Sequence, residues 1–165
     1  MAQFEIKDGV AIIPEGTTEI GEDTFYNCSS LESVIIPESV KKIGNEAFEG
    51  CTSLKSIIIP ESVKKIGDYA FEGCTSLESI TLPDSVASIG WYAFTSCASL
   101  ESIVVAEDNP VYDSREGCNA IIETKTNTLI FGCKSTIIPE SVTKIGDNAF
   151  DGCSSLKSII IPESV

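Results

Sequence analysis

Histidine is absent from this sequence of 165 residues, and methionine and tryptophan occur once each. Without histidine, the chain has no residue for a Ser-His-Asp triad, a Cys-His catalytic pair or a histidine-ligated metal site. Basic residues are also scarce: 11 lysines and arginines stand against 25 acidic residues, which gives a formal net charge of −14. Nucleic acid is therefore excluded as a partner, because its phosphates would repel so acidic a chain.

The sequence also lacks long apolar segments. A membrane-spanning helix would need about 18 consecutive apolar residues, and no such run occurs. Residues 1–10 show neither the basic nor the apolar region of a signal peptide. We therefore expect no membrane insertion, and the chain as written carries no signal peptide. Apolar residues still make up 42% of the composition, which is enough for a packed core, and the length fits a single domain.

What the sequence does contain is a repeat with a fixed period. Ala106 stands 23 residues after Pro83, and the spacing from Ala106 to Pro139 is 33 residues, one period plus ten. Because a unit this short cannot bury its own apolar face, neighbouring units are predicted to stack into a solenoid. The period of 23 is marked by prolines on both sides of the insertion, at Pro14, Pro37, Pro60 and Pro83 and again at Pro139 and Pro162.

Each unit contains three kinds of local structure. The segment before each proline alternates and is rich in β-branched residues, which predicts a strand of about four to six residues that the proline ends. A second short apolar segment, predicted as a strand or extended edge, ends at a glycine. The next segment, with the pattern xAFxGC, predicts one helical or 3₁₀ turn. In the insertion, residues 120–124 and 128–132 are apolar runs around a Lys-Thr-Asn turn and predict a β-hairpin.

The repeat resembles the BspA-like class of leucine-rich repeats over residues 10–165, through the pattern IPxSVxxIGxxAFxxCxSLxSIxIP. The longer unit resembles the irregular unit of that family, in NPVYDS at residues 109–114 and TLIFGCKSTIIP at residues 128–139. The resemblance implies a repeat solenoid: a right-handed leucine-rich-repeat coil with a concave parallel β-sheet, short second strands, single helical turns and one β-hairpin insertion. It also implies a bacterial or protozoan protein that is secreted or located at the cell surface, acts in adhesion and binds host extracellular-matrix proteins.

On this basis, residues 1–165 are expected to form one BspA-like leucine-rich-repeat domain. Residues 1–13 would form an N-terminal partial cap, residues 106–138 the longer irregular unit, and residues 162–165 the truncated start of a next unit. A last coil with nothing after it leaves apolar positions uncovered, here Leu156, Ile159, Ile161 and Val165. We therefore expect a fragment of a longer array that self-associates through its open C-terminal end.

Seven cysteines are present, and five of them occupy one position of the repeat: Cys28, Cys51, Cys74, Cys97 and Cys153. No CxxC pair accompanies them, so no zinc site is predicted, and the five are expected to be reduced thiols buried beside the phenylalanines. Cys118 and Cys133 differ because they flank the predicted hairpin. Two interpretations remain open: a disulfide between them, or Cys133 in the position that leucine occupies in other units.

The acidic residues do not form a pair of catalytic carboxylates. Those that follow the prolines recur at the same position of each unit, as expected for side chains along a solvent-exposed edge of turns. No base and nucleophile constellation accompanies them, and the sequence predicts no catalytic residue, no metal site and no cofactor. One calcium alternative stays open in the insertion, although turn formation explains the same residues: Asp108, Asn109, Asp113 and Glu116.

The predicted strands offer a binding surface. If Leu54, Ile57 and Ile59 point inward, alternation places Ser56 and Ile58 outward. The same positions of successive units give a candidate protein-binding concave face: Ser33, Ile35, Ser56, Ile58, Ser79, Thr81, Ser102 and Val104, continued by Ile137 and Ile160. An exposed row of apolar β-branched side chains suits a protein partner, although it also stabilises a sheet. Two functions remain open: a non-enzymatic protein-interaction module, and a structural spacer of a larger repeat protein with no ligand of its own.

Overall fold

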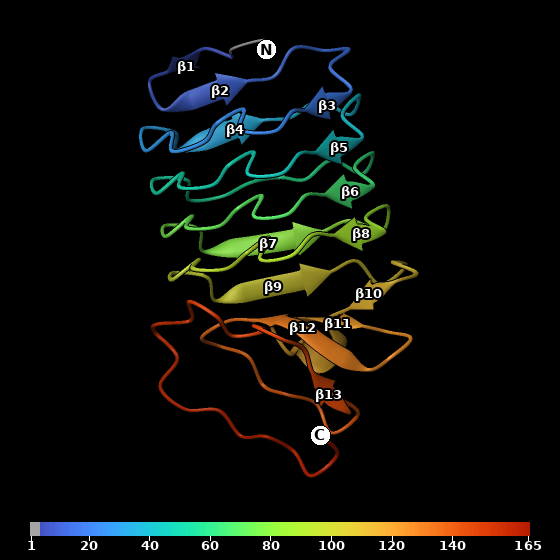
Figure 1. Ribbon diagram of the computed structural model, residues 1–165. Helices are drawn as coiled ribbons and strands as arrows, with labels where there is room; N and C mark the ends of the chain where they lie inside the picture. Colours follow the sequence, from blue (N-terminus) through green and yellow to red (C-terminus); the bar gives the residue numbers. More distant parts are fainter. Residues whose placement is uncertain (1–3) are drawn as a thin grey trace.

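The computed structural model describes residues 4–165 as a stack of coils, with the two termini at opposite ends (Figure 1). Two rows of short strands run along the stack. The first row holds β2 (Val10–Ile12), β4 (Ser33–Ile35), β7 (Ser79–Leu82) and β9 (Ser102–Val105). The second row holds β3 (Glu19–Ile20), β5 (Lys42–Ile43), β6 (Lys65–Ile66) and β8 (Ser88–Ile89). The predicted parallel-sheet solenoid is confirmed.

Strand pairing follows the 23-residue period. In the second row, Ile43 pairs in parallel with Ile66, and Ile66 with Ile89. The first row is interrupted, because β4 and β7 belong to separate sheets and residues 56–59 between them are not a strand. The strand expected in this unit is therefore not formed: the amides of residues 57–59 make no backbone hydrogen bond to either neighbouring coil.

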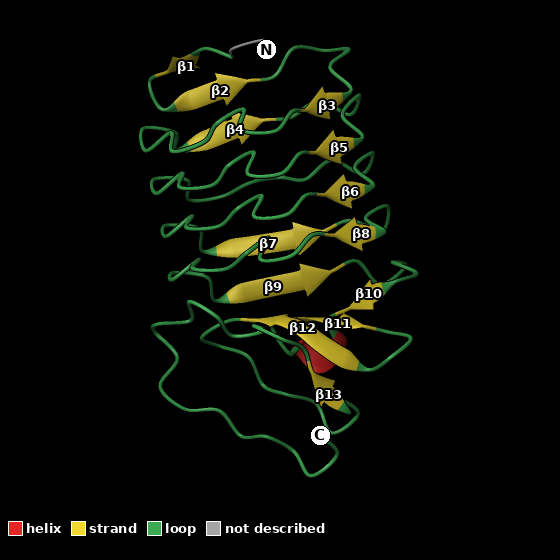
Figure 2. Ribbon diagram, in the orientation of Figure 1, coloured by secondary structure: helices red, strands yellow, loops and turns green. Residues whose placement is uncertain are grey.

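The segment after each second strand consists of hydrogen-bonded turns, which Figure 2 shows as loops. Left-handed residues interrupt any helical path, as Tyr69 has a φ of 56° and Gly73 a φ of 67°. Amides in these turns bond to the next coil instead: the Phe71 N–H donates to the Ala93 carbonyl over 2.8 Å. Among residues 4–165 the one 3₁₀ helix, η1 (Arg115–Gly117), lies in the insertion.

A stack of phenylalanine rings forms the centre of the core. Phe71 lies between Phe48 and Phe94, with ring centroids 5.2 and 5.4 Å away and planes nearly parallel. The side chains of Phe25, Phe48 and Phe71 are almost completely buried. At the start of the chain, β1 (Ile6–Lys7) pairs antiparallel with β2, and Phe4 stacks on Phe25 at 5.9 Å. One aromatic position per repeat thus links each coil to the next from Phe25 to Phe94.

The repeated cysteines line the same core. The Cys74 thiol donates to the Phe48 carbonyl over 3.2 Å, and Cys51 and Cys97 make the same contact one coil away on either side. Burial raises the pKa of the Cys51 and Cys97 thiols to about 12, so these thiols are protonated at neutral pH. Complete burial of all five was expected, but Cys28 and Cys153 are only half-buried because they lie in the first and last turn segments of the stack.

The insertion builds a four-stranded sheet in the order β10 (Tyr112–Asp113), β11 (Ala120–Glu123), β12 (Thr128–Gly132) and β13 (Lys144–Ile145). Strands β11 and β12 are the predicted hairpin, and β12 pairs in parallel with β13 of the last coil. Ile121, Ile122 and Leu129 are fully buried. The hairpin is therefore a layer of the stack, between the coil of β9 and the coil of β13 (Figure 1).

The disulfide considered between Cys118 and Cys133 is not formed, since both are buried free thiols. The pairing of Ala120 with Gly132 places Cys133 opposite Asn119, and Cys118 is one residue further along. One residue of offset turns the side chain to the other face of the hairpin. Cys133 accordingly packs in the main core, whereas Cys118 packs in a second core cluster under the hairpin. The interpretation that Cys133 takes a buried leucine position agrees with this packing.

Candidate protein-interaction surface

The candidate binding residues lie together on the outer side of the first strand row, a surface that we call the strand face. It comprises Ser33, Ile35, Ser56, Ile58, Ser79, Thr81, Ser102 and Val104. Ile58 is 83% exposed, whereas its neighbours Ile57 and Ile59 are 7% and 5% exposed. Ile35 and Val104 are also exposed large apolar side chains. The inferred alternation therefore holds, even in the unit that forms no strand.

Parallel pairing brings equivalent residues side by side. Ser79 pairs with Ser102 and Thr81 with Val104, so each short row of hydroxyl or apolar groups crosses the coils in register. The same register adds a residue that the sequence argument left out: Ile12, 62% exposed, pairs with Ile35. Its signal was present, because Ile12 lies 23 residues before Ile35.

A hollow interrupts the strand face at the unpaired residues 56–59. It has a volume of about 370 Å³ and is lined by Ser56, Ile58, Ser79 and Thr81 together with Glu61 and other neighbours. The hollow lies at the segment between β4 and β7, which belong to separate sheets. The backbone amides of residues 57–59 there make no hydrogen bond to a neighbouring strand. The structure thus gathers four of the eight candidate residues around one depression.

Charged side chains surround this apolar row. The Lys55 ammonium lies 3.1 Å from a Glu32 carboxylate oxygen, and both side chains are largely exposed. Such a pair contributes at most about 1 kcal/mol to stability. Burial and then the charge of Asp84 raise the pKa of Glu61, the carboxyl group beside the hollow. The strand face therefore has an apolar centre with an acidic edge.

The calcium alternative in the insertion receives a different explanation. The Asp113 carboxylate accepts hydrogen bonds from the Arg115 guanidinium at 2.6 and 2.7 Å. Although partial burial opposes ionisation, bonds from Arg115 and Thr124 outweigh it and lower the pKa of Asp113. Asn109 is buried and bonds only to backbone groups. Within residues 4–165, no three His, Cys, Asp or Glu side chains gather in an arrangement that could hold a metal ion.

Over the same described residues, no helix has the length and apolar character needed to cross a bilayer.

The profile of the BspA type leucine rich repeat region matches residues 9–115 and 122–165 in six copies. No curated protein sequence matches the chain significantly. Several solved bacterial structures are similar to it.

A leucine-rich repeat protein from Bacteroides ovatus shares 35% identity over 94% of this chain and 38% of its own length, with a TM-score of 0.64. One from Eubacterium ventriosum shares 25% identity over 95% of this chain and 48% of its own, with a TM-score of 0.68. A leucine rich cell surface protein from Faecalibacterium prausnitzii shares 25% identity over 93% of this chain and 60% of its own, with a TM-score of 0.51. The chain thus spans less than half the length of the first two structures.

Proposed function

The chain belongs to the BspA type leucine-rich repeat family, and from this premise we propose that it is a non-enzymatic interaction module that binds another protein through the strand face. Repeat solenoids present extended surfaces of this kind to their partners. The observation that carries the proposal is the exposed apolar row centred on Ile58, beside a hollow lined by serine and threonine hydroxyls. An apolar centre surrounded by a polar rim is the usual composition of a protein interface.

We extend the proposal to location and partner. The parent protein is secreted or lies at the cell surface and acts in adhesion, with a host extracellular-matrix protein as partner. The similarity to a cell surface protein of Faecalibacterium prausnitzii supports this location. A spacer with no ligand is the alternative. The exposed row of large apolar side chains favours a binding surface over it, because contiguous exposed apolar patches mark interaction sites.

The division of the chain is part of the same proposal: one domain, with residues 1–13 as a partial cap, 106–138 as the irregular unit and 162–165 as the start of another unit. Self-association through the last coil is a further proposal, supported by the 58% exposure of Ile161, whose equivalent Ile59 in an inner coil is 5% exposed.

The strand face is tested with Ile58→Asp. A panel of immobilised, purified extracellular-matrix proteins is screened for binding of the wild-type chain, and affinity for any hit is then measured for the variant. A charge placed in the apolar centre should weaken binding about tenfold or more. Tyr26→Asp is the matched control, because it adds the same charge at an exposed aromatic on the turns.

Equal affinity of Ile58→Asp and wild type would contradict the strand-face proposal, provided that both show the same urea midpoint. Equal loss in both variants would also contradict it, since the effect would then follow from charge alone. A panel in which no matrix protein binds the wild-type chain would contradict the assigned partner class.

A further inference from the structure

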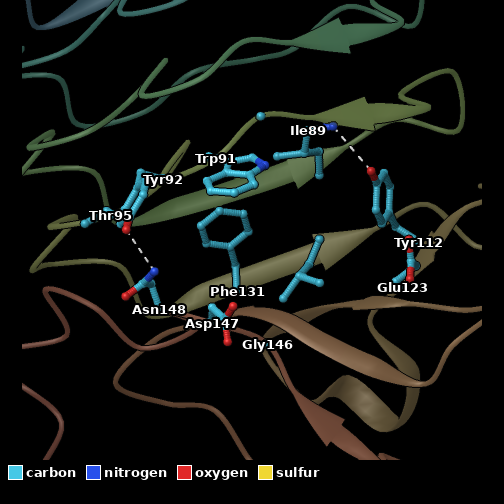
Figure 3. Close-up of a pocket in the computed structure, with 12 residues that line it drawn as sticks. Ile89, Trp91, Tyr92, Thr95, Tyr112, Glu123, Phe131, Gly146, Asp147 and Asn148 are labelled. Carbon is cyan, nitrogen blue, oxygen red and sulfur yellow. Dashed lines mark hydrogen bonds between the residues drawn. The ribbon is translucent and has the colours of Figure 1, made fainter.

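A second concave site lies on the other strand row, between β8 and the hairpin. We call it the aromatic cleft. It has a volume of about 360 Å³, and its lining includes Trp91, Tyr92, Tyr112, Phe131, Glu123 and Asp147. Figure 3 shows Trp91 on one side, Asp147 on the other and Phe131 between them, with Tyr112 and Glu123 towards one end. Nothing in the repeat pattern predicts this cleft.

The cleft opens because the hairpin separates the coils on one side only. In the second row, the Gly146 N–H donates to the Leu129 carbonyl of the hairpin over 2.8 Å, instead of reaching the coil of β8. On the turn side the same coils touch directly: a Cβ added at Gly152 would lie 2.4 Å from the Ser96 Cα. The edge of β8 left uncovered is capped by Tyr112, whose hydroxyl accepts the Ile89 N–H at 3.3 Å.

Trp91 stands at the end of a regular row of side-chain contacts. Asn45 accepts the Asp68 N–H over 3.0 Å, and Asp68 accepts the Trp91 N–H over 2.8 Å. An indole has no acceptor group, so the row cannot continue past Trp91. The equivalent position of the last coil is Asp147, which follows Gly146 as Trp91 follows Gly90. Trp91 is 77% exposed, and its indole side chain takes part neither in this row nor in the core.

The charge of the cleft is one-sided. Its lining includes the carboxylates of Glu123 and Asp147 but no lysine or arginine. Neither carboxylate belongs to any of the ion pairs formed within residues 4–165, and Lys144 on the adjacent β13 is not part of the lining. The whole chain carries a formal charge of −14, which favours a cationic ligand over an anionic one.

We propose that the aromatic cleft binds a basic side chain of the protein partner, with the cationic group against the Trp91 ring and paired with Asp147 or Glu123. A cation over an indole face is attracted by the ring quadrupole, and carboxylates add charge-assisted hydrogen bonds. Arginine fits better than lysine, because its planar guanidinium stacks on aromatic rings and binds carboxylates in pairs. This inference rests on the proposed interaction function and names the chemistry of one part of the partner.

The test uses Trp91 itself, because it is the single tryptophan of the chain. The full chain is titrated with the capped peptide Gly-Gly-Arg-Gly-Gly while the tryptophan emission is recorded. A capped Gly-Gly-citrulline-Gly-Gly peptide is the matched control, since citrulline keeps the shape and lacks the charge. We expect a saturable change with the arginine peptide that weakens with added salt, and about tenfold weaker binding of the citrulline peptide.

Variants identify the groups involved. Asp147→Asn and Glu123→Gln together should weaken binding of the arginine peptide about tenfold, since both carboxylates that line the cleft are neutralised. Asp84→Asn, which neutralises an exposed carboxylate outside the cleft, should leave it unchanged. Ile58→Asp should also leave it unchanged, because Ile58 is not part of the lining.

Three results would overturn the inference: equal binding of both peptides, equal binding by the double variant, or no saturable change at any soluble peptide concentration. A response to a neutral oligosaccharide such as cellotriose, without one to the arginine peptide, would also overturn it in favour of a sugar site. The proposed function is judged separately. A partner whose binding depends on Ile58 but is unaffected by the double variant would overturn the cleft inference and leave the strand face intact.

Discussion

At the scale of single residues, position in the repeat decides what each side chain does. Phe71 has a ring on either side, at 5.2 and 5.4 Å, and is completely buried. Phe4 has the same chemistry but stacks on one ring only and is half-buried. The energetic contribution of each phenylalanine therefore follows from how many coils cover it.

Phe71→Ala is expected to lower the free energy of unfolding by about 3–5 kcal/mol, because it opens a cavity between two rings that remain in place. Phe4→Ala is the matched control and should cost about 1–2 kcal/mol, since less area leaves the core. Urea denaturation followed by circular dichroism measures both. A cost below about 1 kcal/mol for Phe71→Ala, or equal costs for the two variants, would show that the ring stack is not the centre of the core.

The inward and outward positions could be predicted from the sequence, because each position of the 23-residue repeat occurs in several units with the same type of residue. The phenylalanine stack and the exposure of Ile58 followed from this periodicity and from strand alternation. The predicted complete burial of Cys28 and Cys153 was wrong, since both are only half-buried. The repeat treats all units alike, whereas burial depends on whether a coil lies on both sides.

At the scale of elements, the buried side-chain amide of Asn109 connects the start of the insertion to the preceding coils. The Asn109 amide nitrogen donates to the Pro83 and Val86 carbonyls over 2.9 Å. Its oxygen accepts the N–H groups of Val111 and Tyr112, also over 2.9 Å. Asn109 thus fixes the start of β10 against the preceding coil, and all four hydrogen-bonding positions of its side chain are used.

Asn109→Ala should therefore destabilise the chain by about 2 kcal/mol or more, since several buried backbone groups lose their partner. Asp108→Ala, at the exposed neighbouring residue, should change stability by no more than about 0.5 kcal/mol. The same urea denaturation measures both variants. A neutral Asn109→Ala would mean that water replaces the amide, and the anchoring role assigned to Asn109 would be wrong.

The hairpin could be located from sequence, and β12 matches the predicted residues 128–132. The effects of the hairpin on its pairing register and on the neighbouring coils could not be predicted. The pairing of Ala120 with Gly132, which separates Cys118 from Cys133, depends on a bulge between Ile121 and Ile122 that no turn residue announces. The aromatic cleft likewise arises from how the hairpin is layered between coils. Trp91 reads in the sequence as an ordinary turn residue, because its exposure depends on the layer that follows.

At the scale of the whole molecule, the stack presents two separate concave sites, one on each strand row. The strand face combines a row of apolar side chains with hydroxyl groups and includes the interruption of the sheet at residues 56–59. The aromatic cleft is acidic and lies beside the inserted hairpin. Both occur where the regular pairing of coils fails. We infer that departures from the repeat, more than the repeat itself, create binding sites on this solenoid.

The strand-face proposal is tested most directly by hydrogen–deuterium exchange of the chain with and without its bound protein partner. The amides of residues 57–59 make no backbone hydrogen bond, so they should exchange rapidly in the free chain. Binding through the strand face predicts slower exchange at residues 56–59 in the complex, with residues 22–30 on the turns unchanged. Slower exchange confined to residues 22–30, with residues 56–59 exchanging as in the free chain, would contradict the account.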